Sequence, residues 1–247
     1  MSDEAKMLLP KKYVCPICEG NFVSKAVKTG SARFVRTNLD LRPIYQNLEI
    51  LKYDPVMCPA CGYAALEKYF GGLSQVQMAQ IRDKIAKDFK PRSSDAEVYT
   101  YDAALERYKL CLLSAMVKRA NDSETGYICL KISWLLQSKA DWLSENEPEK
   151  QKEIDACMIQ EKNYAMNALE CLEKARMEED YPICGMNEPT LNYLLAALAY
   201  KADRLDFAIK TLSYVTSSRE ATERLKDKVY DLKALIAEKK KETEDTM

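Results

Sequence analysis

The stretch VMCPACGY (residues 57–64) repeats a pattern that the chain has already used in YVCPICEG (residues 13–20). Each stretch places two cysteines three positions apart, with a proline after the first. A C-x2-C turn brings two sulfur atoms to one edge of a tetrahedron, and four thiolates at about 2.3 Å form a common shell for structural zinc. The two stretches therefore predict one zinc site with four cysteine ligands: Cys15, Cys18, Cys58 and Cys61.

The two stretches differ directly after the second cysteine. Gly62 follows Cys61, and a glycine there lets the chain curl so that backbone N–H groups face a sulfur. Glu19 occupies the matching position of the first stretch, and Gly20 comes one residue later. This departure affects the turn residue and leaves the predicted ligands as they are.

Other uses of paired cysteines fit the sequence less well. A redox C-x-x-C motif needs one pair at a helix start within a βαβ pattern, and neither pair has that setting. An iron–sulfur cluster or another metal stays open as an alternative. Four protein ligands close a zinc shell, whereas a catalytic zinc keeps a position for water, so we expect a structural ion. We interpret the remaining cysteines as small apolar packing residues: Cys111, Cys129, Cys157, Cys171 and Cys184.

Residues 1–70 are predicted to form a small zinc-ribbon-like head. Within it, NFVSKAVKTGSARFVRTN (21–38) has two strand-like runs around the turn signal KTGS, which predicts a hairpin folded over the metal site. The head has too few large apolar residues to fold alone, and zinc supplies an apparent ~10–16 kcal/mol in small peptides. Zinc with four thiolates carries a formal charge of about −2. We expect basic residues between the cysteine pairs to offset it: Lys25, Lys28, Arg33 and Arg36.

The apolar period becomes helical from residue 73, and residues 71–247 are predicted to form a second, helical domain. Ser94 or Asp95 is expected to cap the helix that follows the linker KPRSSD (90–95). The chain is thus predicted to be mainly α with a small β-containing head, α+β overall. Helices are expected over these approximate ranges: 73–89, 96–120, 127–143, 149–178, a pair within 190–218, and 219–242.

One part of the helical body has a repeat signature. In LLAALAYKADRLDFAIKTLSYV (194–215), small residues lie on both helices of a pair that a short turn joins, which resembles a tetratricopeptide repeat. Asn192 and Ala199 depart from the residues usual at their positions. Two to three such antiparallel pairs would build an α-solenoid, and such arrays present a groove to a protein or peptide. We expect Trp134 and Trp142 to lie in the core.

The composition is that of an ordinary soluble chain, with 47% apolar and 30% charged residues and a net charge of −1. Such a charge indicates no global attraction to nucleic acid or anionic membranes. We expect no secretory signal in the acidic first residues, and the longest apolar run (193–200) is too short to span a bilayer. With an odd number of cysteines, nine, complete disulfide pairing is impossible. We therefore expect a cytoplasmic protein without a membrane partner.

The order of these features resembles a known family. YVCPICEGNF, a basic strand pair, YDPVMCPACGYAALEKYF and a helical-repeat body together resemble the bacterial family of unknown function numbered 2225. The most specific part is CPACGYAA (58–65), preceded by KYDPV (52–56). The resemblance implies a cysteine-bound metal, a cytoplasmic setting and tetratricopeptide-like helices, with no established activity. Matching positions assign the ligands Cys15, Cys18, Cys58 and Cys61.

Three functions fit the sequence, which contains no histidine and so lacks the commonest general base. The one we favour is a non-enzymatic scaffold that binds a protein or peptide in the groove of the helical body. The second is nucleic-acid binding through the four basic residues of the head, because strand alternation would put Lys28 and Arg36 near one edge. The third is an enzyme with a site at the junction of head and body. Its candidate acid–base residues are Tyr53, Asp54, Tyr63, Glu67 and Tyr69.

Overall fold

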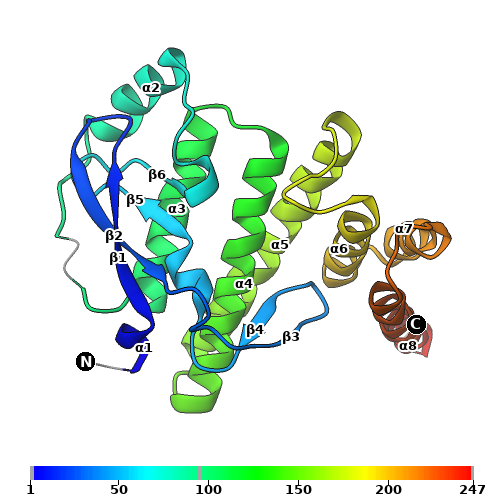
Figure 1. Cartoon of the computed structure of the whole chain (residues 1–247). Helices are drawn as coiled ribbons and strands as arrows, with labels where there is room; N and C mark the ends of the chain where they lie inside the picture. The colour runs from blue at the N-terminus through cyan, green and yellow to red at the C-terminus, as the bar shows by residue number, and fades with distance from the viewer. Residues whose placement is uncertain (1–2, 94–95, 246–247) are drawn as a thin grey trace.

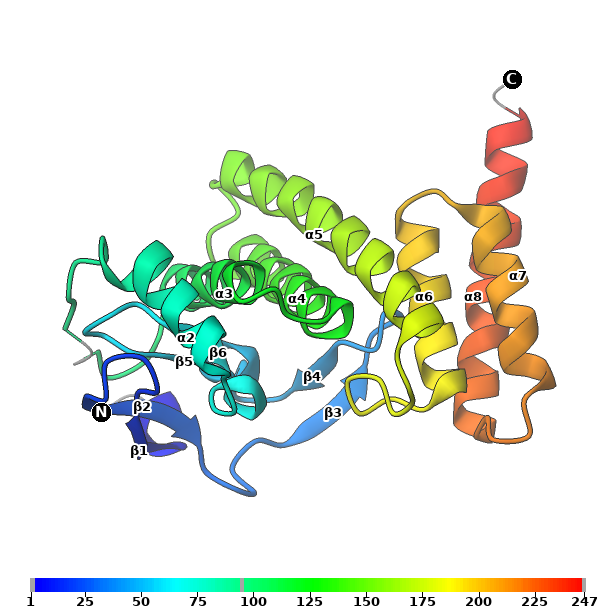
Figure 2. The same cartoon turned by 90° about the horizontal axis from the view of Figure 1, so that it is seen from above.

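A computed structural model describes residues 3–93 and 96–245 of the chain. Three small sheets lie at the amino-terminal end, and long helices follow one another in chain order toward the carboxyl terminus (Figure 1). Seen from above, the helices form a row that ends in α6, α7 and α8 (Figure 2). The prediction of a mainly helical chain with a small β-containing part is confirmed.

Each sheet consists of two antiparallel strands. The strand pairs are β1 (Leu8–Val14) with β2 (Asn21–Val27), β3 (Phe34–Thr37) with β4 (Pro43–Tyr45), and β5 (Pro55–Met57) with β6 (Ala64–Leu66). The loop 15–20 connects β1 to β2, and the loop 58–63 connects β5 to β6. Each pair of predicted ligands therefore lies in the loop of its own hairpin.

The hairpin predicted within residues 21–38 is wrong. β2 pairs with β1 over seven residues, from Leu8 opposite Val27 to Val14 opposite Asn21, while β3 pairs with β4 in a separate sheet. The physical reason is that the cysteine loop joins β1 directly to β2 and so fixes their pairing. β1 was missed because LLPKKYV combines a proline with two lysines, which is a weak strand signal.

The short helical elements flank the sheets, and the long helices form the body. The short elements are α1 (Asp3–Lys6), the 3-10 turns η1 (Ile50–Tyr53) and η2 (Glu67–Tyr69), α2 (Gln75–Ile81) and the π-helical turn η3 (Arg82–Ala86). The long helices are α3 (Tyr101–Val117), α4 (Asp122–Asn146), α5 (Gln151–Glu178), α6 (Glu188–Lys201), α7 (Leu205–Ser217) and α8 (Glu223–Asp245). From α3 to α8, each helix packs against the next along the chain.

Two helix starts differ from the prediction. The side chain of Thr100 caps α3 by accepting the backbone N–H of Ala103, so this helix begins at Tyr101 rather than at residue 96. The predicted caps, Ser94 and Asp95, lie outside the described residues. The helix expected over 127–143 begins earlier, at Asp122, so DSETG (122–126) forms the first turn of α4.

The largest hydrophobic cluster extends across the predicted boundary at residue 70. Met57 and Leu66 of the third sheet are buried in the same cluster as Tyr108 and Cys111 of α3. The division into domains 1–70 and 71–247 stays a prediction. Any experiment that separates the two parts would nevertheless expose this shared core.

The helical body confirms some finer expectations and corrects another. Trp134 is buried as predicted, whereas Trp142 is 41% exposed and contacts the ring of Tyr101 at the surface. α6 and α7 form the predicted pair with a short connection, and the tetratricopeptide-like arrangement of the whole body stays a prediction. Among the described residues, no helix has both the length and the apolar character that crossing a bilayer requires.

Candidate metal centre

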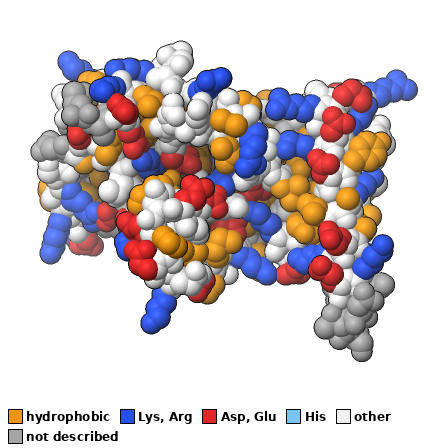
Figure 3. Space-filling view, turned by 90° about the horizontal axis from the view of Figure 1, so that it is seen from below, with side chains coloured by type: hydrophobic (Ala, Val, Ile, Leu, Met, Phe, Trp, Pro, Cys, Tyr) orange, Lys and Arg blue, Asp and Glu red, His pale blue; other side chains and the backbone are white. Residues whose placement is uncertain are grey.

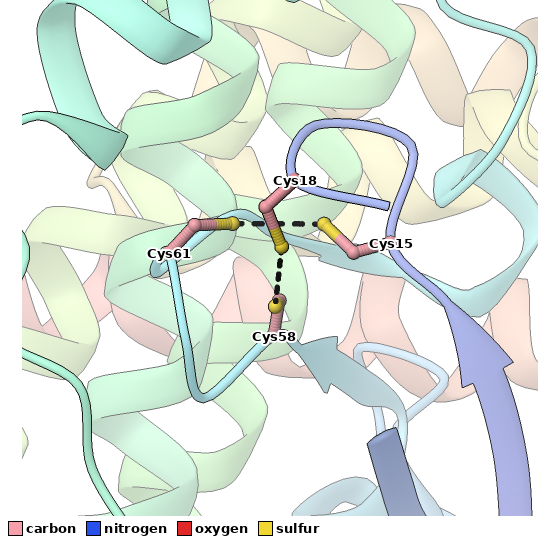
Figure 4. Close-up of side chains that lie close together, drawn as sticks. All are labelled: Cys15, Cys18, Cys58 and Cys61. Carbon is pink, nitrogen blue, oxygen red and sulfur yellow. Dashed lines mark hydrogen bonds between the residues drawn. The ribbon is translucent and has the colours of Figure 1, made fainter. Parts of the chain in front are cut away.

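The loops of the first and third sheets bring four sulfur atoms together (Figure 4). The Sγ atoms of Cys15 and Cys61 are 3.6 Å apart, as are those of Cys18 and Cys58. All four Sγ atoms lie within 4.8 Å of one another. Each short distance joins one cysteine of the first loop to one of the second, so the cluster connects the two hairpins.

The first cysteine turn (residues 15–20) and the second cysteine turn (residues 58–63) have the same backbone hydrogen bonds. In the first, the N–H of Glu19 donates to the carbonyl of Cys15 at 2.9 Å, and the N–H of Cys15 donates to the carbonyl of Gly20 at 3.0 Å. In the second, the corresponding bonds run from Gly62 to Cys58 and from Cys58 to Tyr63, both at 2.9 Å.

Both turns also require the same unusual backbone conformation at the residue after the second cysteine. Gly62 has φ of 74°, and Glu19 has φ of 61°. This left-handed region costs little for glycine and roughly 1–2 kcal/mol for an L-residue with a side chain. Gly62 is needed for a second reason, because a Cβ atom there would lie 2.2 Å from the ring of Phe89.

The geometry of the cluster fits a tetrahedral cation. Four sulfur atoms at the zinc–sulfur distance of about 2.3 Å define a tetrahedron whose edges are about 3.8 Å. The two short contacts are 3.6 Å, and all the sulfur atoms lie within 4.8 Å of one another. Disulfide bonds require about 2.05 Å between sulfur atoms, and all four cysteines are free. The four residues present therefore fit a zinc ion.

Hydrogen bonds and charge within the cluster favour the ionised form of at least one thiol. The pKa of Cys58 is held well below its usual range, because its sulfur accepts hydrogen bonds from Cys15 and Cys61 and, more weakly, from backbone N–H groups. The pKa of Cys61 is raised by its hydrogen bonds with Cys15 and Cys58. The backbone N–H of Ile17 donates to Cys15 Sγ at 3.4 Å. A bound divalent cation would stabilise the thiolate form of all four cysteines, so none of them would need to keep its proton.

A family model described as "Uncharacterized protein conserved in bacteria (DUF2225)" matches residues 8–236. The chain belongs to this family. The match includes both cysteine turns and reaches into α8. A search of curated proteins and a search of solved structures found no match. Because DUF2225 is uncharacterised, membership assigns no activity, and the functional argument rests on the residues of this chain.

Aromatic residues of both hairpins surround the cysteine turns in this DUF2225 member. Tyr13 and Phe22, at the ends of β1 and β2, stack with ring centres 5.6 Å apart, and both contact the edge of Phe70. Phe70 contacts Tyr63 of the second turn at 5.1 Å. The hydroxyl of Tyr63 donates to the carbonyl of Phe70 at 3.0 Å. The rings thus pack the first hairpin against the second.

The basic residues predicted to surround the metal do not form one strand face. Lys25 lies on β2 and Arg36 on β3, which belong to separate sheets, so the alternation that placed Lys28 beside Arg36 does not apply. The ammonium of Lys28 donates to the carbonyl of Lys6 at 2.6 Å, and Arg33 is exposed before β3. Nucleic-acid binding by these residues stays a prediction.

A basic side chain that was not predicted, Arg82, lies beside the first cysteine turn. Arg82, in the π-helical turn after α2, donates from Nε to the carbonyl of Ile17 at 3.0 Å. Arg82 was missed because it is distant from the cysteines in sequence, and only the helical period of residues 73–89 indicates where it points. In this fold α2 and η3 bring it back to the head.

The residues proposed for an enzyme at the junction separate into two groups. Tyr53, Asp54 and Glu67 line one cavity between head and body. Tyr63 is fully buried in the aromatic cluster, and Tyr69 packs its ring under the ammonium of Lys68. Asp54 is paired with Lys131, and Glu67 with Lys11 and Tyr13, so no free acid–base pair emerges among these described side chains.

Proposed function

We propose that this chain is a cytoplasmic zinc-binding scaffold: a structural Zn²⁺ held by four cysteines organises the head, and the helical body binds a protein or peptide. The observation that carries the proposal is the meeting of four sulfur atoms within 4.8 Å. A zinc with four protein ligands has no position for a substrate or water, so its contribution is to hold the two hairpins together. The absence of histidine supports a non-enzymatic role.

Exposed apolar side chains on the body support the binding role. Figure 3 shows apolar side chains exposed among charged ones over the helical body. On α5, Ile159 is 64% exposed, Met166 40% and Met177 68%. These residues are seven and eleven positions apart, about two and three helical turns, so they form one line along the helix. Such a line is typical of a helix surface that contacts another protein.

The metal part of this proposal is tested by metal analysis of the purified protein. We expect one zinc per chain in the wild type and a loss of zinc from Cys58→Ser. Cys171→Ser is the matched control, because Cys171 lies on α5 outside the cluster. A metal-free wild type, or equal zinc in both variants, would contradict the proposed site.

The binding part is tested by affinity capture from cells with the full chain, because a separated body would expose the shared core. The triple variant Ile159→Ser, Met166→Ser, Met177→Ser should lose the proteins that the wild type captures. Val14→Ser is the control, since Val14 is 63% exposed on β1 of the head. If Val14→Ser loses the same proteins and the α5 variant keeps them, the body is not the binding surface.

A further inference from the structure

A cavity of about 740 Å³ opens between the head and the helical body, apart from the cysteine cluster. This volume is in the range typical of small-molecule sites. Its walls come from the end of β2 and the loop after it, β4, η1, the end of β6 with the start of η2, α4 and the loop after α5. The polar part of its lining is dominated by three lysines and three tyrosines: Lys28, Lys68, Lys131, Tyr45, Tyr53 and Tyr127.

The lysines of this cavity are not balanced by the acidic residues that share it. Asp54 is paired with Lys131, and Glu67 is paired with Lys11 outside the cavity lining. In the part of the chain that the structure describes, Lys28 and Lys68 have no carboxylate within salt-bridge distance. The ammonium of Lys28 donates one hydrogen bond to the carbonyl of Lys6, a neutral group that leaves its charge unbalanced. The cavity therefore keeps two positive charges that an anion would neutralise.

One of these charges is held against aromatic rings. The ammonium of Lys68 lies 4.4 Å from the ring centre of Tyr69 and 4.5 Å from that of Tyr127. The ammonium of Lys131 lies 5.0 Å from the same Tyr127 ring. Burial lowers the pKa of Lys68; the nearby Cys184 opposes this shift, and the charge of Lys131 adds to it. Two cations on one ring repel each other, so an anion placed beside them is favoured.

Much of the remaining lining is apolar. Val27 and Ala32 contribute from the end of β2 and the loop after it, Ile50 from η1 and Leu66 from β6. Together with the tyrosine rings, these side chains offer a surface for a planar apolar group. Cavities that combine apolar walls with a few convergent charges are typical of sites for small organic ligands.

We propose that this cavity binds a small aromatic anion, whose flat group packs against the tyrosines and whose carboxylate or phosphate is held by Lys28 and Lys68. The site requires no metal and no partner protein. It is therefore independent of the zinc-binding and scaffold roles proposed above, and either proposal can fail without the other.

Calorimetric titration of the zinc-loaded full chain tests this proposal with matched probes. 1-Naphthyl phosphate and 1-naphthoate carry the ring with each type of anion, 1-naphthol carries the ring alone, and inorganic phosphate carries the charge alone. We expect at least one of the two aromatic anions to bind at one site per chain. Naphthol and inorganic phosphate should each bind at least about tenfold more weakly, since each lacks one set of contacts.

Three substitutions assign the binding to the cavity. Lys68→Met and Lys28→Met should each weaken the aromatic anion about tenfold or more, and Lys68→Arg should retain binding. Lys12→Met is the control, because Lys12 is exposed on β1 and does not line the cavity. Lys28 and Lys68 are both exposed, so each variant is expected to fold and tests the site separately. The proposal is overturned if neither anion binds at millimolar concentration, if naphthol binds as tightly, or if both methionine variants bind like the wild type.

Discussion

The two cysteine turns have the same backbone and very different surroundings. Both turns make the same pair of hydrogen bonds and use one left-handed residue. In the second turn, Cys58, Cys61 and Gly62 are all buried, and the ring of Phe89 covers the glycine. In the first turn, Cys18 and Glu19 are exposed.

Different forces therefore stabilise the two turns. The second turn lies between the aromatic cluster and Phe89, and the sheet that carries it packs on α3, so protein contacts hold most of its conformation. The first turn has fewer packing contacts of this kind, and its Glu19 adopts a strained left-handed conformation. We infer that the metal contributes more to the order of the first turn than to that of the second.

Removing the metal should give the largest effect and separate the turns most clearly. Binding of structural zinc supplies up to ~10–16 kcal/mol, which chelation removes. We expect the N–H of Glu19 to exchange with solvent rapidly after chelation, while the N–H of Gly62 keeps much of its protection. Amide hydrogen exchange with and without a chelator measures both groups in one experiment. Equal loss of protection at both amides would show that packing does not distinguish the turns.

Gly62→Ala should give the next largest effect, on the second turn alone. The new Cβ would require a left-handed alanine and would lie 2.2 Å from Phe89, so we expect a loss of about 3 kcal/mol in the free energy of unfolding. Glu19→Ala is the matched control, because glutamate and alanine have the same energetic cost in the left-handed conformation. It should change the free energy of unfolding by less than about 0.5 kcal/mol. Urea unfolding of the zinc-loaded protein measures both.

A result with Gly62→Ala as stable as the wild type would mean that Phe89 moves aside at little cost. In that case the second turn is less tightly packed than the structure indicates. Adding Phe89→Leu to Gly62→Ala would then not raise the free energy of unfolding above that of Gly62→Ala alone. If the clash is real, the same combination should recover part of the lost stability.

Short-range chemistry in the sequence was enough to predict which four cysteines lie together. Two C-x2-C stretches of the same form identified Cys15, Cys18, Cys58 and Cys61, and the structure brings their sulfur atoms together. The long helices were predictable for a similar reason, because a period of 3.6 residues is visible within a single element. α5, expected over residues 149–178, extends over Gln151–Glu178.

Features that depend on contacts between distant segments were not predictable in this way. The pairing of β1 with β2 required knowing that a cysteine loop forms a hairpin, and LLPKKYV alone does not show it. Arg82 reaches Ile17 across 65 positions. The cavity at the junction combines residues from six parts of the chain, none of which has a motif of its own.

Glu19→Gly tests the strain of the first turn directly. Glycine adopts φ of 61° at little cost, whereas glutamate pays roughly 1–2 kcal/mol, and the greater freedom of glycine in the unfolded chain offsets part of the difference. We expect the zinc-loaded protein to gain up to about 1 kcal/mol in urea unfolding. A loss of stability would mean that the Glu19 side chain makes a contact more valuable than the relief of strain.

Glu67→Gln should give the smallest effect and tests the ionic contact between the two hairpins. Lys11 and Tyr13 of β1 both donate hydrogen bonds to Glu67, which follows β6. These bonds lower the pKa of Glu67, although burial opposes them. The carboxylate therefore stabilises the fold above its unfolded pKa of about 4.3, and this stabilisation is lost as the pH falls through the lower folded value.

At pH 7 we expect Glu67→Gln to cost less than about 1 kcal/mol, because the pair is half exposed. Urea unfolding at several pH values should show the difference from wild type shrinking below pH of about 4. Both proteins would lose zinc at acid pH, so the difference between their free energies of unfolding at each pH does not contain this shared effect. Glu19→Gln is the control for the loss of one exposed glutamate carboxylate. A difference that stays constant down to acid pH would assign the effect of Glu67 to packing rather than to charge.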